Sequence, residues 1–237
     1  MIYNDFKFQD QRPTDFNKYI RVKSCDIGFP NKAKIVSSVP FSNQIYDFST
    51  IYGDQAYSER EIKYVLNVVD PNDFTAQRMS LLKTKLINWL MKPNRKVPLY
   101  DDTITGYHFL GEVQSENSIE DNFRYGELTI TFTCYPFMIK DLTEGNDIWD
   151  DFNFETDVAQ ATEYDIVGSK TITLINVGIQ TAYPDITCSS DMAVKVGNTT
   201  YELKAGISTG LPLAVDANTL TIIGNGHIKL DWHREVI

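Results

Sequence analysis

The sequence predicts a mainly β protein of two domains, built from β-sandwich-type sheets with one substantial α-helix. Three observations support this fold class. Aromatic side chains, which suit half-buried pleated sheets, make up 12% of the 237 residues. Several short segments alternate apolar and polar residues with the period of a strand. Only one segment repeats its apolar residues at helical spacing.

The first quarter of the chain indicates short strands separated by loops. Arg21–Ile27 and residues 33–36 are brief strand candidates, and Gly28, Pro30 and Asn31 lie between them. Residues 47–58 are rich in Tyr, Ser and Gly, which is typical of a loop or a weak hairpin.

A clear strand is predicted over residues 61–70, followed by the helix. The strand alternates apolar with polar residues, and Pro71 ends it. Asp73 or Thr75 could cap the next element. Near residues 76–91 the apolar residues recur every three or four positions, which predicts a helix packed on a sheet; they are Met79, Leu82, Leu86, Trp89 and Leu90. Pro93 ends this helix.

Residues 92–106 are expected to form an extended, exposed arm. Residues 92–102 combine prolines, basic residues and aspartates, a composition that favours neither a buried strand nor a helix. We therefore expect this segment to reach a neighbouring subunit, adding an edge strand through main-chain hydrogen bonds.

A strand over residues 127–135 closes the first domain. Leu128, Ile130, Phe132 and Cys134 share one face and threonines fill the other, until Pro136 ends the ladder. Five Asp and two Glu then follow within residues 141–157. This shift in composition predicts an acidic linker between a domain at 1–140 and a second domain at 158–237.

The second domain is predicted to be a small β-sandwich of short strands. Gly197-Asn198 is a good two-residue hairpin turn between strands at 192–196 and 200–203. Strands at 219–223 and 228–232 flank Gly224-Asn225-Gly226. In the last of these strands Trp232 alternates with charged residues, so its side chain is expected to face inward.

Composition and charge exclude several classes of protein. A net charge of −10 argues against gripping nucleic-acid phosphates, which needs clustered Lys and Arg. Cys25, Cys134 and Cys188 lie far apart, are odd in number and form no CxxC pair, so we expect free thiols. We see neither a signal peptide nor an apolar run long enough to span a bilayer, which predicts folding in a cytoplasm.

No catalytic, cofactor-binding or metal site is predicted. His227 and His233 are separated by roughly 20 Å along one strand, too far to share a metal ion directly. His108 lies in an aromatic strand. The acidic residues Asp147, Asp150, Asp151 and Glu155 lack the glycine and spacing of an EF-hand loop, so we interpret them as a solvated linker. A pair of carboxylates for glycoside cleavage stays open, because such pairing is spatial.

The order of these parts resembles the distal tail (Dit) proteins of siphovirus-type bacteriophages over essentially the whole chain. The more specific pieces are Phe132-Thr-Cys-Tyr-Pro-Phe137 and Asn176-Val-Gly178 followed by Tyr183-Pro-Asp-Ile186. The start departs from the family, whose opening hairpin and Gly-rich turn are weak here.

The resemblance implies a non-enzymatic structural protein of the virion tail tip, made in the bacterial host cytoplasm. Its first domain would form a homo-hexameric ring, and its second would be a galectin-like, jelly-roll sandwich. The implied partners are the tail tube protein, the tail-associated fibre or lysin protein, and receptor-binding proteins. No cofactor, membrane or specific nucleic acid is implied, although the genome passes through the ring.

Three other interpretations remain open. A carbohydrate-binding β-sandwich module is the main alternative, a β-rich hydrolase is another, and a tail tube or baseplate-ring protein is the third. We also expect the acidic balance to line the channel with carboxylates that repel DNA phosphates.

Overall fold

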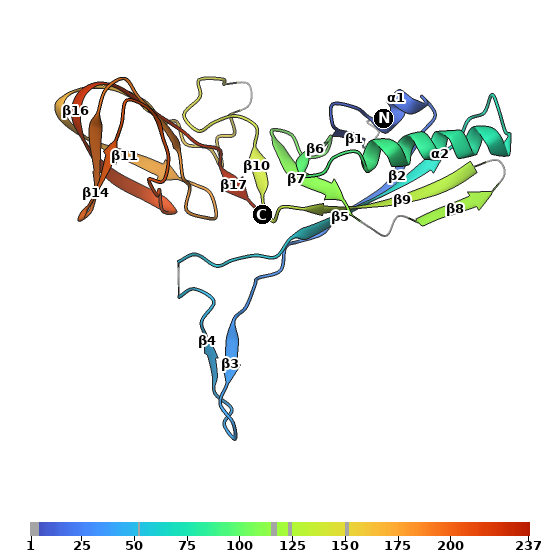
Figure 1. Cartoon of the computed structure of the whole chain (residues 1–237), viewed down its shortest axis with the longest axis horizontal. Coiled ribbons are helices and arrows are strands. Elements are labelled where there is room, and N and C mark those ends of the chain that lie inside the picture. Colours follow the sequence, from blue (N-terminus) through green and yellow to red (C-terminus); the bar gives the residue numbers. More distant parts are fainter. Residues whose placement is uncertain (1–4, 52, 115–117, 123–124, 150–151) are drawn as a thin grey trace. The chain divides into compact units, whose positions relative to one another are not determined.

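The computed structural model describes residues 5–51, 53–114, 118–122, 125–149 and 152–237. The chain divides into two compact units, Met1–Met138 with Ile237, and Ile139–Val236. Each unit contains one principal β-sheet, and the first also carries the one long helix found among the described residues (Figure 1). The predicted fold class, mainly β with one substantial helix, is confirmed.

The first unit is built on an antiparallel sheet in the order β1-β6-β7-β9-β5-β2. β8 pairs with the first half of β9. The strand bounds are Phe6–Phe8 (β1), Arg21–Ile27 (β2), Arg60–Val68 (β5), Val97–Asp101 (β6), Tyr107–Val113 (β7), Ser118–Asn122 (β8) and Tyr125–Cys134 (β9).

The two central strands confirm the predicted alternation. β5 and β9 lie side by side in a register that pairs Ile62 with Phe132 and Tyr64 with Ile130. All four side chains are buried, whereas Glu61 and Lys63 on the other face are exposed. A sheet covered on one face needs apolar residues on that face only, which is the pattern of an antiparallel sheet with one wet side.

The buried face of this sheet is covered by the predicted helix, α2 (Ala76–Leu90). Thr75 is its N-cap, and its side chain accepts a hydrogen bond from the Arg78 amide at 3.3 Å. The predicted apolar stripe is buried along its whole length. Trp89 stacks on Phe6 with ring centroids 6.0 Å apart and donates its indole N–H to the Phe8 carbonyl at 3.2 Å. A single-turn helix, α1 (Pro13–Phe16), precedes β2.

A hairpin projects from the first unit between β2 and β5 (Figure 1). Its strands are β3 (Val36–Ser38) and β4 (Ile45–Asp47), and they form a two-stranded sheet of their own. We call residues 29–58 the arm. The sequence indicates strands and loops here, but it gives no sign that the segment leaves the body of the unit.

The prediction of an extended, exposed arm at residues 92–106 is wrong. Residues Val97–Asp101 form β6, which pairs with β1 on one side and β7 on the other. Leu99 and Asp101 are buried. The segment is extended, as its composition predicts, but both of its edges are occupied by strands distant in sequence, which the local pattern does not reveal.

The second unit folds its strands around one core. The sheet order is β14-β13-β16-β12-β15, and β11 pairs with β16. The strand bounds are Glu163–Asn176 (β11), Asp185–Cys188 (β12), Met192–Val196 (β13), Thr199–Leu203 (β14), Gly206–Ser208 (β15) and Asp216–Asp231 (β16). The Gly197-Asn198 turn between β13 and β14 is confirmed.

β16 is one bent strand and not the two strands expected around Gly224-Asn225-Gly226. Its first half pairs with β13 and its second half with β12, while β11 follows it throughout. Gly224 and Gly226 adopt φ of +146° and +140°, which bends the strand without ending its pairing with β11. The bend lets Ile222 and Ile228, from the two halves, share one core.

The described residues of the segment 141–157, expected to be a linker, belong to the second unit, and some of them are buried there. Glu144 is only 3% exposed, and the Asp157 side chain is 4% exposed. The segment follows β10 (Met138–Lys140), which pairs with β17 (Glu235–Val236). Two of the acidic residues in this segment are therefore buried. Their burial is possible because basic side chains of the same unit neutralise their charges.

Candidate functional site

The histidines and cysteines form no reactive grouping in the described part of the chain. No cluster of three or more His, Cys, Asp and Glu could hold a metal ion there. His227 Nδ1 lies 3.0 Å from Asp165 Oδ1, and His233 Nδ1 lies 2.8 Å from the Lys140 carbonyl. All three cysteines are free, and burial raises the pKa of the Cys134 thiol to about 12. Such a thiol packs as a hydrophobe and is a poor nucleophile.

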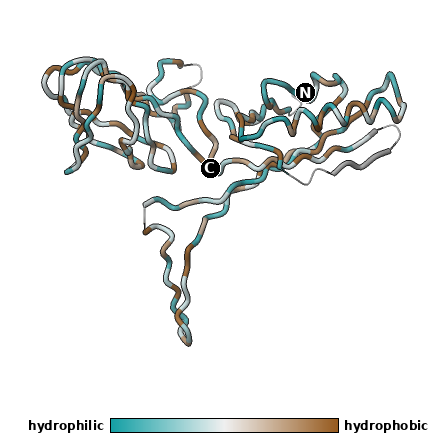
Figure 2. Tube along the Cα trace, in the orientation of Figure 1, coloured by the Kyte–Doolittle hydropathy of each residue, from teal (hydrophilic) through white to brown (hydrophobic). Residues whose placement is uncertain are grey.

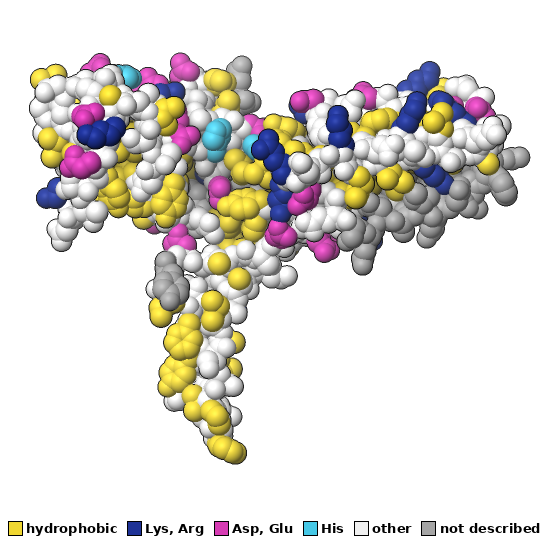
Figure 3. All heavy atoms as spheres, viewed as in Figure 1, with side chains coloured by type: hydrophobic (Ala, Val, Ile, Leu, Met, Phe, Trp, Pro, Cys, Tyr) yellow, Lys and Arg dark blue, Asp and Glu magenta, His cyan; other side chains and the backbone are white. Residues whose placement is uncertain are grey.

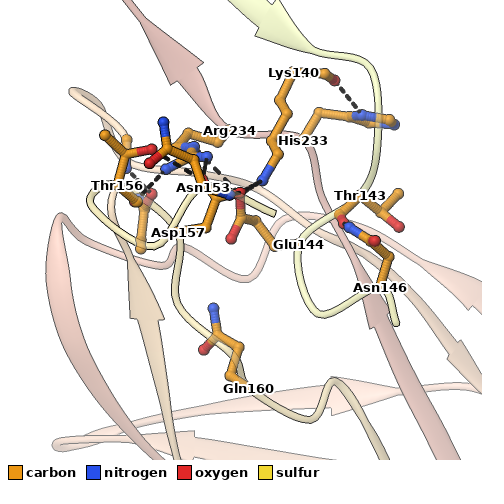
Figure 4. Close-up of polar contacts among 12 residues, drawn as sticks. Lys140, Thr143, Glu144, Asn146, Asn153, Thr156, Asp157, Gln160, His233 and Arg234 are labelled. Atoms are coloured by element: carbon orange, nitrogen blue, oxygen red, sulfur yellow. Dashed lines mark hydrogen bonds and ion pairs between the residues drawn. The ribbon is translucent and has the colours of Figure 1, made fainter. Parts of the chain in front are cut away.

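The most elaborate polar arrangement is a buried ion cluster in the second unit, formed by Lys140, Glu144, Asp157 and Arg234 (Figure 4). Lys140 Nζ lies 2.8 Å from Asp157 Oδ2, and Arg234 Nε lies 3.3 Å from Glu144 Oε1. Arg234 also pairs with Asp157 and donates to the Thr156 carbonyl at 2.6 Å. Two cations and two carboxylates leave the cluster with no net charge.

The two carboxylates of this cluster differ in their electrostatics. Burial would raise the pKa of Asp157, but hydrogen bonds from Lys140 and Arg234 hold it well below its usual range. Burial raises the pKa of Glu144, and the nearby Arg234 and Lys140 offset this only in part. Asp157 is therefore the residue that the cations stabilise most, and Glu144 bears more of the desolvation penalty.

A polar pocket of about 440 Å³ lies next to this cluster. Its lining includes Asn146, Asp147, Glu163, Lys229 and Asp231, and no aromatic side chain of a described residue contributes. Lys229 Nζ is already held 3.0 Å from Asp231 and 3.4 Å from Glu163. The arrangement is an exposed ion-pair network without the stacking platform that sugar binding favours.

Two further predictions concern this unit. Trp232 is buried in the core, so it offers no exposed ring to a sugar. Asp147 and Glu155 are exposed, as a solvated acidic stretch requires, whereas Asp150 and Asp151 lie outside the described residues.

The arm presents the most prominent uncovered apolar surface of the first unit. Cross-strand pairing places Ile35 opposite Phe48, Ser37 opposite Tyr46 and Val39 opposite Gln44. One face therefore carries a stripe of apolar side chains, which we call the arm stripe: Ile35, Val39, Tyr46 and Phe48. The exposed fractions of its members run from 36% for Val39 to 63% for Ile35.

Apolar residues are prominent along the whole arm. Hydrophobic segments alternate with polar ones along both strands (Figure 2), and apolar side chains cover much of its visible surface (Figure 3). At the tip, Phe41 is fully exposed with φ of +61°, an uncommon conformation for a residue with a side chain. The other face carries Val36, Ile45 and the ion pair between Lys34 and Asp47 at 2.8 Å.

The arm is the exposed apolar feature that sequence reasoning missed. Its signal was present, because Ile35, Val39, Tyr46 and Phe48 flank the turn residues Pro40 to Asn43 as a hairpin would require. The pattern does not say whether the apolar face packs against the body of the unit. Only the fold reveals that it does not.

No family model matches the chain, and no curated protein matches it. Among solved structures, the Dit protein of phage SPP1 matches over 100% of both chains, with a TM-score of 0.66 and 12% sequence identity. That protein is described as a paradigm of the hub adsorption apparatus in phages that infect Gram-positive bacteria. The chain has the Dit fold.

Two other matches come from the phage p2 baseplate in its activated conformation, one with strontium and one with calcium. Both cover at least 97% of each chain at 11% identity, but their TM-scores of 0.42 and 0.40 carry no argument. The assignment of the Dit fold therefore rests on the match to SPP1 Dit, which covers both units of this chain.

None of the helices in the described ranges is long and apolar enough to cross a membrane.

Proposed function

We propose that this chain is a non-enzymatic distal tail hub protein of a siphovirus-type phage, located at the tail tip. It forms a homo-hexameric ring that joins the tail tube to the tail-associated fibre or lysin protein, and it anchors receptor-binding proteins. The observation that carries this proposal is the match in fold to the SPP1 Dit protein over the full length of both chains. The absence of a metal-binding cluster among the described residues is compatible with a structural role.

The arm supports self-association. A two-stranded hairpin with strands of three residues is marginal in water on its own, and this one also exposes an apolar stripe. A contact with a second copy would bury the arm stripe and hold the hairpin. Because a ring is closed by a head-to-tail interface, each copy would both extend its arm and receive that of a neighbour.

The uncovered face of the first sheet is suited to a water-filled channel. It carries Thr129, Thr131 and Thr133 from β9, with Glu61 and Lys63 beside them on β5. This face has mixed charge, so the net acidity of the chain is not concentrated there. A duplex sliding past it would find neither clustered cations nor apolar patches to hold it.

Negative-stain images of the purified chain test the proposal. Six-fold rings with a central hole are the expected result, and light scattering should give a mass of about six chains of 27.1 kDa. The proposal would be contradicted if the protein stayed monomeric at all concentrations, or if it degraded cell-wall polymer.

A further inference from the structure

The exposed side of α2 is a basic surface in an acidic chain. Residues 76–96 contain six Lys and Arg and no Asp or Glu, although acidic residues outnumber basic ones by 32 to 22 in the whole chain. Leu81 and Lys85 are exposed at a spacing of four residues, so they lie on one face of the helix. Lys92 and Arg95 are exposed just beyond its last residue.

This surface combines uncompensated positive charge with uncovered apolar side chains. Its three exposed cations form no ion pair with a described residue, unlike Arg78, which pairs with Asp70 at 2.8 Å. Leu81 and the C-cap residue Met91 are 46% and 47% exposed. We call these residues the α2 surface: Leu81, Lys85, Met91, Lys92 and Arg95.

A loop of the second unit has the complementary character. Its apolar members are exposed by fractions that run from 47% for Ile148 to 83% for Phe154. Phe152 lies against Trp149 and Phe154, with ring centroids 5.2 and 5.1 Å apart, so the three rings form one group. The two carboxylates that flank this group are exposed and form no ion pair with a described residue. We call the exposed, described members the aromatic loop: Asp147, Ile148, Trp149, Phe154 and Glu155.

The packing of its own unit explains neither surface. A single exposed apolar residue is ordinary, but a group of exposed aromatic rings marks an interaction site. Tryptophan in particular is enriched among the residues that contribute most to binding. The second unit has 15 acidic and 6 basic residues, whereas the first has 17 and 16, so the α2 surface and the aromatic loop also lie in regions of different net charge.

We propose that the aromatic loop of one copy docks on the α2 surface of a second copy. The rings cover Leu81 and Met91, and the loop carboxylates accept charge-assisted hydrogen bonds from the cations beside them. The contact uses no residue of the arm stripe. It therefore goes beyond the ring contact of the proposed function and can be tested separately from it.

Trp149 is a built-in reporter of this contact, because it is 63% exposed whereas Trp89 and Trp232 are 5% and 4% exposed. In the full-length wild type, quenching of tryptophan fluorescence by acrylamide should weaken as the protein concentration rises. In the variant Lys85→Glu/Lys92→Glu, protection should need roughly tenfold more protein, because exposed ion pairs are replaced by repulsion.

A matched control carries the same change in net charge at two exposed lysines outside the α2 surface. This variant, Lys18→Glu/Lys195→Glu, should be protected like the wild type. If both variants lose protection equally, or if neither does, the α2 surface is not the docking site and the inference fails.

A mixture tests whether the contact joins two chains. An excess of Trp149→Phe, which lacks the reporter but keeps the α2 surface, should restore the protection of Trp149 in Lys85→Glu/Lys92→Glu. If the mixture restores nothing, or if wild-type quenching does not change with concentration, two copies do not meet in this way and the inference fails. Concentration-dependent protection in a wild type that forms no rings would support this contact while the proposed function fails.

Discussion

At the scale of single residues, the ion cluster of the second unit predicts unequal effects for its two carboxylates. Asp157→Asn should destabilise the unit by about 3–5 kcal/mol, because it leaves Lys140 and Arg234 buried with one counter-charge fewer. Glu144→Gln should cost much less at neutral pH, since it also removes a buried charge whose pKa burial raises. Urea unfolding of the two variants measures the difference, and equal losses would contradict the assignment.

The same cluster predicts acid sensitivity. The pKa of Asp157 is lowered in the folded state, so its stabilisation is complete above its ordinary value of 3.8 and is lost as the pH falls below that value. Glu144 acts in the opposite sense, because its raised pKa favours the folded state below about 4.5. We expect the wild type to lose stability below about pH 4, and Asp157→Asn to lose less, in unfolding curves recorded from pH 7 to 3. Parallel curves would show that Asp157 does not govern this loss.

At the scale of elements, the two faces of the arm predict different roles for two isoleucines. Ile35 lies on the arm stripe and is 63% exposed, whereas Ile45 lies on the other face and is 68% exposed. Burying such a side chain contributes about 2 kcal/mol. Ile35→Ser should therefore weaken each subunit contact by roughly 30-fold, and Ile45→Ser should leave assembly nearly unchanged.

Neither substitution should alter the unfolding of the monomer, since both side chains are exposed there. Sedimentation velocity across a concentration series measures assembly, and thermal unfolding at low concentration serves as the control. If both variants weakened assembly equally, the arm would not contact the neighbouring copy through the arm stripe alone.

Elements with a strong local pattern could be predicted from the sequence, and those defined by distant pairing could not. The spacing of Met79, Leu82 and Leu86 predicts α2, and the alternating threonines predict β9. In both elements a single buried face fixes the period at which apolar residues recur in the sequence. β6 could not be placed, because Leu99 is buried only through pairing with β1 and β7. Likewise, the buried state of Asp157 depends on Arg234, which lies 77 residues away along the chain.

At the scale of the whole molecule, the fold persists where the sequence has diverged. The match to SPP1 Dit spans both chains at 12% identity, so the shared architecture does not depend on most of its individual side chains. Within each unit of this chain, alternating apolar residues enclose one core, and many different residues can satisfy that requirement.

The net charge of −10 makes a prediction about assembly as a whole. Copies of an acidic chain repel one another, and salt screens that repulsion over a Debye length of about 10 Å at 0.1 M. If the ring forms through the apolar arm stripe, its assembly should strengthen as salt rises from about 0.02 to 0.5 M, because screening removes repulsion and leaves the apolar contact intact. Light scattering at fixed protein concentration measures this, and rings that dissociate with salt would instead indicate an interface held mainly by exposed ion pairs.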